Sequence, residues 1–146
     1  MTTLKKFIFS TIALLAITFS TLTTTGCWLF SGSENKEIQI DTAEKWLIAM
    51  DHKKYEQCYQ ETAQEFKNAK NLSDFLLHCK KDRATYGLVR SRSLVQTKTV
   101  TDKRGNTYFF IKFKTFFSKD NAFEILYLSE GKSKNYQIAK YYIINF

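Results

Sequence analysis

The spacing of apolar residues along the chain changes near Gly87. Before this glycine, apolar side chains recur three or four positions apart, which places them on one face of a helix. After it, apolar and polar side chains tend to alternate, as they do on the two faces of a strand. The pattern therefore predicts a block of helices followed by a block of strands.

Three helical segments are expected in the first block. The first opens with a capping box, in which the side chains of Asp41 and Glu44 each bond to the other residue's backbone amide. A second apolar run extends over residues 55–66. Asn71 begins the third segment, and Gly87 ends it, because glycine readily adopts the left-handed conformation that terminates helices.

Four strands are expected in the second block, separated by the turn-forming segments 102–106, 118–121 and 130–135. Connections this short join antiparallel neighbours, because a parallel crossover needs about a dozen residues or more. We therefore expect an α+β fold, with about three helices packed on one face of a four-stranded antiparallel sheet. The segment 107–118 carries aromatic residues on both faces, so the outer face either forms a pocket or groove or is covered by lysine and tyrosine side chains.

The first 26 residues have the three zones of a secretory signal peptide. Lys5 and Lys6 precede an apolar run of about a dozen residues, well short of the ~20 needed to span a bilayer, and small hydroxylated residues follow. The end of this segment resembles the lipobox of bacterial lipoproteins, a run of small residues ending in Gly26-Cys27. Thr24 departs from the leucine that is usual three positions before the cysteine.

The lipobox resemblance implies that the sulfur of Cys27 carries a diacylglycerol and that this cysteine becomes the new N-terminus. Residues 1–26 are then the signal peptide, residues 27–37 the anchor cysteine with a polar tether, and residues 38–146 a single domain. We expect an exported protein, anchored in the bacterial envelope with its domain in the periplasm. Ordinary cleavage near residue 25 or 26, which would release a soluble periplasmic or secreted protein, stays open.

Two cysteines remain once Cys27 is assigned to the lipid. The midpoint between Cys58 and Cys79 falls in the connection predicted near residues 68–72. Antiparallel helices joined by a short loop bring such positions together, and exported proteins reach an oxidising compartment. We predict a Cys58–Cys79 disulfide, with two buried free thiols as the alternative. Neither cysteine belongs to a Cys-x-x-Cys unit, so the sequence does not favour redox catalysis.

The chain from about Asp41 to Phe146 resembles the bacterial exported family known as domain of unknown function 4019. The resemblance rests on residues spread over the predicted helices and strands: Trp46-Leu47, Asp51, Tyr55, Arg83, Gly87, Arg92, Phe113, Thr115, Phe117, Glu124 and Tyr141. It implies a fold and an exported location, but no reaction. The order of elements also resembles the cone-shaped fold of the cystatin-like and nuclear transport factor two-like groups, and fold alone does not give function.

Four polar positions within the resemblance are candidates for chemistry, namely Arg83, Arg92, Glu124 and Tyr141. The arginines could bind an anionic ligand through paired hydrogen bonds, or an Arg–Glu pair could fix a helix against the sheet. No nucleophile or general base accompanies them, and the sequence has no Gly-rich phosphate loop or metal-ligand spacing. We assign no catalytic residue, no metal and no cofactor.

Basic residues concentrate in the second half of the chain. Residues 28–78 hold nine acidic and six basic side chains, a net charge of −3. Residues 79–146 hold five acidic and 14 basic side chains, a net charge of +9. An exported protein rarely meets nucleic acid, so anionic lipid head groups or an envelope protein are the expected partners. The predicted function is a non-catalytic binding module of the envelope; the alternative is a small enzyme or ligand-binding protein with a pocket between sheet and helices.

Overall fold

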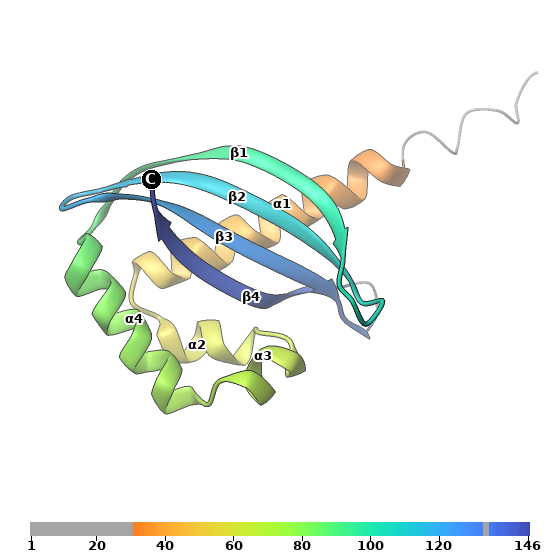
Figure 1. The fold of residues 1–146 in the computed structure, drawn as a ribbon, viewed down its shortest axis with the longest axis horizontal. Helices are drawn as coiled ribbons and strands as arrows, with labels where there is room; N and C mark the ends of the chain where they lie inside the picture. The colour runs from red at the N-terminus through yellow and green to blue at the C-terminus, as the bar shows by residue number, and fades with distance from the viewer. Residues whose placement is uncertain (1–30, 133–134) are drawn as a thin grey trace, which may run out of the picture.

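Four helices precede four strands along the chain, as the ribbon in Figure 1 shows. The computed structural model describes residues 31–132 and 135–146, so the predicted signal peptide and Cys27 lie outside the described residues. The helices are α1 (Ser31–Asp51), α2 (Tyr55–Gln60), α3 (Gln64–Ala69) and α4 (Leu72–Tyr86). The strands are β1 (Val89–Thr101), β2 (Thr107–Phe117), β3 (Asn121–Glu130) and β4 (Tyr136–Asn145).

α1 is already helical at Ser31, well before the start that the sequence predicts. The predicted capping box is wrong, because Asp41 lies inside the helix and its carboxylate pairs with Lys45 one turn further on, at 2.7 Å. Residues 33–40 contain neither proline nor glycine, so nothing there interrupts a helix. The segment expected to be a polar tether is thus helical from residue 31, and the side chains of residues 35–38 are exposed.

The apolar run 55–66 forms two short helices instead of one. They separate at Thr62 and Ala63, where the Ala63 amide donates to the carbonyl oxygen of Ile138 at 2.9 Å. Thr62 also forms an isolated parallel bridge with Ile138 of β4. Contact with a distant strand therefore divides a helical pattern that local spacing predicts to be continuous.

Both ends of α4 lie where the sequence predicts them. The Asn71 side chain accepts a hydrogen bond from the Asp74 amide at 2.9 Å, which is an N-cap arrangement. At the other end, Gly87 has φ +84°, a conformation that residues with a side chain rarely adopt. A Cβ at this position would also lie 2.1 Å from Ser118 Oγ, so glycine is required there.

The four strands form one antiparallel sheet in the order β1-β2-β3-β4, and the predicted turns connect its neighbours. The sheet curves around α1, which contacts β2, β3 and β4, while α3 and α4 lie on the β4 side (Figure 1). The predicted α+β class and antiparallel sheet are confirmed. No helix in the described parts of the chain is long and apolar enough to cross a membrane.

The core lies between the helices and the inner face of the sheet. Apolar side chains three or four positions apart on α1 and odd-numbered apolar side chains of β2 both face it; they include Ala43, Trp46, Leu47, Met50, Ile111 and Phe113. Its largest fully buried apolar side chains are Phe75, Phe113, Leu47, Met50, Ile111, Leu126, Leu128 and Ile138. Trp46 is also buried there, and its ring edge meets Tyr141 at a centroid distance of 5.0 Å. Side chains therefore fill the space between α1 and the sheet.

Candidate functional site

Six polar side chains from six different elements meet where α1 ends. This polar cluster consists of Asp51 of α1, Arg83 of α4, Arg92 of β1, Thr115 of β2, Glu124 of β3 and Tyr141 of β4. The structure thus brings together all four positions that the sequence marks as candidates. It also adds two partners, Asp51 and Thr115.

Glu124 is the centre of the polar cluster, and its side chain is fully buried. Its Oε2 accepts hydrogen bonds from Arg92 Nε at 2.7 Å and from Thr115 Oγ1 at 2.6 Å. Its Oε1 accepts one from the Tyr141 hydroxyl at 2.8 Å. A buried carboxylate is costly unless it is paired and hydrogen-bonded, and here each of the other three strands supplies one partner.

Asp51 binds both arginines of the polar cluster. Arg92 donates to it through Nη1 and Nη2 at 3.0 and 3.2 Å, and Arg83 donates through Nη2 at 2.8 Å. The Arg83 guanidinium also lies 5.5 Å from the ring centroid of Phe117. Arg92 therefore bridges a carboxylate on α1 and one on β3, and Arg83 joins α4 to the Asp51 carboxylate on α1.

These surroundings shift the pKa values of two cluster members. Burial lowers the pKa of Arg92, but the charge of Glu124 and hydrogen bonds to both carboxylates outweigh it, so the net shift is upward. Burial raises the pKa of the Tyr141 hydroxyl well above its usual value, and the Glu124 charge adds to the effect. Arg92 therefore stays charged and Tyr141 stays protonated around neutral pH, so neither acts as a proton carrier there.

The polar cluster has the properties of a structural clamp. Two carboxylates face two guanidiniums, so their formal charges cancel. In the part of the chain that the structure describes, every buried side-chain nitrogen or oxygen has a hydrogen-bond partner. A site built for an anionic ligand would leave donors without a partner until the ligand binds. The geometry therefore favours the structural alternative over anion binding.

The sequence-based candidates omit Asp51 and Thr115. An aspartate at a helix end and a threonine in a strand are ordinary residues, and neither stands out by composition. Both belong to the family pattern, in which Asp51 follows the Trp-Leu pair and Thr115 lies between two phenylalanines. That pattern is the one signal in the sequence that could have placed them with the arginines.

The predicted Cys58–Cys79 disulfide is wrong for this structure, because both residues are free thiols buried in the same core. The prediction assumes one turn midway between them, whereas α3 lies between α2 and α4 and removes that symmetry. The Cys58 thiol donates to the Trp46 carbonyl oxygen at 3.7 Å, whereas Cys79 lines a groove between α4 and β4. Both thiols belong to the same core cluster, and no bond joins them.

Neither buried thiol has the character of a catalytic nucleophile. Burial raises the pKa of Cys58 and of Cys79 to about 12. The thiolate is the reactive form of cysteine, and at neutral pH both groups stay protonated. They are therefore best understood as small apolar residues of the core.

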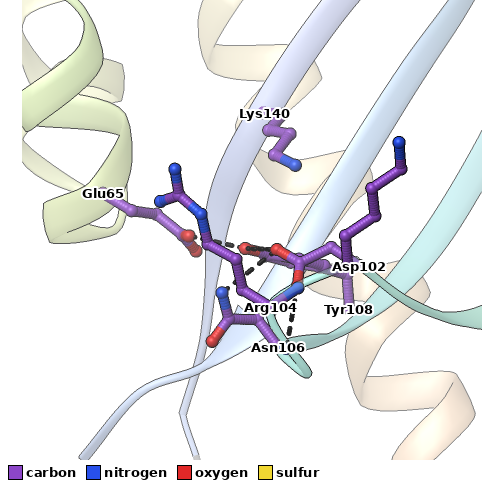
Figure 2. A pocket seen from close by; sticks show the side chains of 7 residues that line it. Glu65, Asp102, Arg104, Asn106, Tyr108 and Lys140 are labelled. Atoms are coloured by element: carbon purple, nitrogen blue, oxygen red, sulfur yellow. Dashed lines mark hydrogen bonds between the residues drawn. The ribbon is translucent and has the colours of Figure 1, made fainter.

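A shallow pocket of about 370 Å³ lies beside the β1–β2 hairpin, as Figure 2 shows. It is lined by Glu65, Asp102, Lys103, Arg104, Asn106, Tyr108 and Lys140. Asp102 accepts hydrogen bonds from the amides of Arg104 and Asn106 at 2.8 and 3.0 Å. The Tyr108 hydroxyl donates to Glu65 at 2.8 Å, and this bond, together with burial, raises the pKa of Tyr108 to about 12. Glu65, Asp102, Asn106 and Tyr108 thus bond to one another and hold the predicted turn in place.

The outer face of the sheet, opposite the helices, carries lysines among aromatic rings. Its lysines are Lys98, Lys112, Lys114 and Lys140, and each Nζ lies over a ring. The closest approach places Lys112 Nζ 3.5 Å from the ring centroid of Phe123. Lys140 Nζ lies 4.5 Å from the ring centroid of Tyr108. These contacts correspond to the alternative in which lysine side chains cover the outer face.

The lysines leave part of the outer face apolar and open. Phe116, Tyr142, Ile144 and Phe146 are between 38% and 52% exposed. No carboxylate occupies an outward position in the described strands, and Glu65 and Asp102 lie at the hairpin end of the face. The outer face is therefore basic and apolar at the same time.

Fold and site together define a class of protein: a small α+β domain in which a buried ion-pair cluster ties two helices to four strands. Within the described residues, no three His, Cys, Asp or Glu side chains are grouped so that they could hold a metal ion. The chain belongs to the family described as Protein of unknown function (DUF4019), whose model matches residues 42–141. This match confirms the resemblance seen in the sequence, and it spans the whole polar cluster.

One solved structure similar to this chain is that of Bdellovibrio bacteriovorus Bd1075, with 18% sequence identity and a TM-score of 0.46. The similarity covers 71% of this chain and 38% of the Bd1075 chain, so the present chain spans well under half of that protein. No curated protein shows significant similarity to the chain.

Proposed function

We propose that the protein is an exported bacterial lipoprotein, anchored by acyl chains on Cys27, whose periplasmic domain is a non-catalytic binding module. Its outer face binds the anionic lipid head groups of the membrane that holds the anchor. The observation that carries the proposal is the composition of that face, where four lysines lie over aromatic rings and no strand carboxylate opposes them. Aromatic rings suit the head-group level of a membrane, and lysines are attracted to anionic lipids.

The anchor and the outer face act together in this proposal. Cys27 precedes Ser31, where α1 is already helical, by four positions. Four residues span at most about 14 Å, so acyl chains on Cys27 would keep the start of α1 close to the membrane. Each buried methylene of an acyl chain contributes ~0.8 kcal/mol, and two chains give stable anchoring. The acyl chains then hold the domain at the membrane, and the lysines orient it.

The alternative function, a small enzyme or ligand-binding protein, needs open space between the sheet and the helices. Trp46, Phe113 and Phe117 occupy the interior part of that space, with exposed fractions of 2%, 1% and 4%, and the groove of about 400 Å³ between α4 and β4 lies at its edge. The polar cluster that could have served a ligand has its hydrogen bonds formed without one. Both observations support a binding module without catalysis.

Intact mass spectrometry of the protein produced in a bacterium tests the anchor. We expect a mature chain that begins at Cys27 and carries the added mass of a diacylglycerol. A Cys27→Ser variant is expected to lack that mass and to leave the membrane fraction. A mature chain that begins at Cys27 without acyl mass, or cleavage near residue 25 or 26, would contradict the lipoprotein proposal.

Binding to vesicles that contain phosphatidylglycerol tests the outer face. A chain that starts at Trp28 has no acylation site and keeps every described residue. Exchange of Lys112 and Lys114 for glutamine is expected to weaken vesicle binding about 30-fold at low salt, because each well-placed basic residue contributes ~1 kcal/mol. Co-sedimentation over a range of salt concentrations measures this change.

Exchange of Lys80 and Lys81 for glutamine is the matched control for the vesicle experiment. It removes the same charge from exposed positions on α4, which does not belong to the outer face. We expect a much smaller loss of vesicle binding for this pair. Equal losses for the two double variants would show that net charge alone drives binding, and the proposed role of the outer face would then be wrong.

A further inference from the structure

β4 is an edge strand, and most of its free edge is unpaired within the described parts of the chain. The segment at Thr62 and Ala63 pairs with it at Ile138, near the beginning of the strand. Beyond that point no described segment pairs with the edge. A free edge presents a row of backbone donors and acceptors to which another strand can bind.

The two edge strands of the sheet differ in how they are protected. β1 carries three basic residues, Arg90, Arg92 and Lys98, although Leu94 and Val95 between them are 44% and 52% exposed. Residues 141–146, by contrast, contain no charged residue and no proline, and Tyr142 and Ile144 are 49% and 52% exposed. Charged residues and proline are the usual means of preventing edge-to-edge pairing. Residues 141–146 lack them, so this part of the β4 edge is suited to accept a strand.

A groove of about 400 Å³ runs along this edge, between β4 and α4. Four consecutive strand residues, 141–144, form one wall of it. Consecutive side chains in a strand point to opposite faces, so a wall made of four in a row includes the backbone edge itself. Phe66 and Phe75 supply apolar lining, and the Tyr86 hydroxyl bonds to Asn145 Oδ1 at one end.

Asp82 of α4 also lines this groove. Its carboxylate forms no hydrogen bond or ion pair with another residue that the structure describes. Burial raises the pKa of Asp82, and the nearby charges of His78 and Lys70 act against that shift. A partly desolvated acceptor without a direct partner is suited to a donor on a bound molecule.

We propose that this groove binds one extended peptide segment of a partner protein, which adds to β4 as a fifth strand. Its backbone would pair with residues 141–144, an apolar side chain would lie against Phe75, and an arginine or lysine would face Asp82.

The protein's own chain uses the same edge, since the Ala63 amide already bonds to Ile138. Because α4 flanks the groove, a second copy pairing through β4 would bring its own α4 to the same place. A single segment avoids that conflict.

This inference does not depend on the proposed membrane contact, because it uses the edge of β4 and a face of α4 instead of the lysines of the outer face. Loss of vesicle binding would leave it untouched. Loss of peptide binding would equally leave the proposed function untouched.

A capped hexapeptide that alternates valine and threonine, with one arginine, is the probe. Fluorescence polarisation measures its binding to the mature protein in detergent, and hydrogen exchange reports protection of the amides of residues 141–144. We expect binding with protection of those amides. The same peptide with alternate amides N-methylated cannot pair with a strand edge, and we expect it to bind at least about tenfold more weakly.

Ile144→Lys places a charge on the β4 edge at an exposed position, and Leu94→Lys does the same on β1. We expect Ile144→Lys to weaken probe binding at least about tenfold and Leu94→Lys to leave it unchanged. Equal binding of the N-methylated peptide, equal effects of the two variants, or no binding at about 1 mM probe would overturn the inference. So would a protein dimer that forms through β4 and excludes the probe.

Discussion

Replacement of Arg92 with alanine is expected to lower the free energy of unfolding by about 3–5 kcal/mol. The substitution removes the guanidinium that neutralises Glu124, whose side chain is fully buried. That carboxylate then stays in the core without its charge partner, and Asp51 loses two hydrogen bonds. Urea denaturation followed by tryptophan fluorescence measures the change in stability. An unchanged slope of the unfolding free energy against urea concentration shows that the same amount of surface is exposed on unfolding.

Arg90→Ala is the matched control, because Arg90 lies on the same strand with an exposed side chain. Its effect is expected to stay within about 0.5 kcal/mol. Arg92→Lys keeps the charge but loses the planar fork that bridges two carboxylates, so an intermediate loss is expected. If Arg92→Ala costs less than about 1 kcal/mol, the polar cluster is not the clamp described here.

Exchange of both partners, Arg92→Met together with Glu124→Leu, separates two contributions to stability. One is the net contribution of the ion pair, and the other is the cost of leaving one buried charge without its partner. Buried ion pairs can often be replaced by apolar residues of similar volume without loss, whereas breaking one partner is strongly destabilising. The double variant is therefore expected to be more stable than Arg92→Ala alone. Such a result would assign the damage in the single variant to the unpaired carboxylate of Glu124.

The features that the sequence predicts correctly are those set by neighbouring residues. The change of period at Gly87, the N-cap at Asn71 and the turn at residues 102–106 each depend on a few adjacent side chains. The start of α1 is the exception. A capping pattern at Asp41 indicates where a helix can begin, but it does not stop a helix that has already formed before it.

The features that the sequence does not predict depend on distant contacts. The break between α2 and α3 exists because the Ala63 amide bonds to Ile138, which lies on the last strand. The disulfide prediction assumes a single turn midway between Cys58 and Cys79, and the presence of α3 between α2 and α4 removes that symmetry. The polar cluster is intermediate: the family pattern names its members, whereas only the folded chain shows that Asp51 joins both arginines.

Replacement of Trp46 with alanine is also expected to lower the free energy of unfolding by about 3–5 kcal/mol. The side chain is 2% exposed, and its ring packs against Tyr141 and Phe75 at centroid distances of 5.0 and 6.4 Å. Alanine would leave a cavity where α1 meets β4 and α4, and the filled core described above leaves little freedom to collapse around it. Urea denaturation followed by circular dichroism measures the loss, because the substitution removes one of the chain's two tryptophans and so changes the fluorescence signal itself.

Trp46 also provides a hydrogen-bond donor for a backbone carbonyl of α2, so its role is not limited to packing. Its indole N–H donates to the Cys58 carbonyl oxygen at 3.0 Å, while the amides of Glu61 and Thr62 bond to other carbonyls. Trp46→Phe keeps an aromatic ring but leaves that carbonyl without its donor, so a loss of about 1–3 kcal/mol is expected. Ile48→Ala, at a 52% exposed position on the same helix, is the control and should change stability by less than about 0.5 kcal/mol. A phenylalanine variant as stable as the natural protein would mean that the hydrogen bond to Cys58 does not contribute, and that packing alone explains the tryptophan.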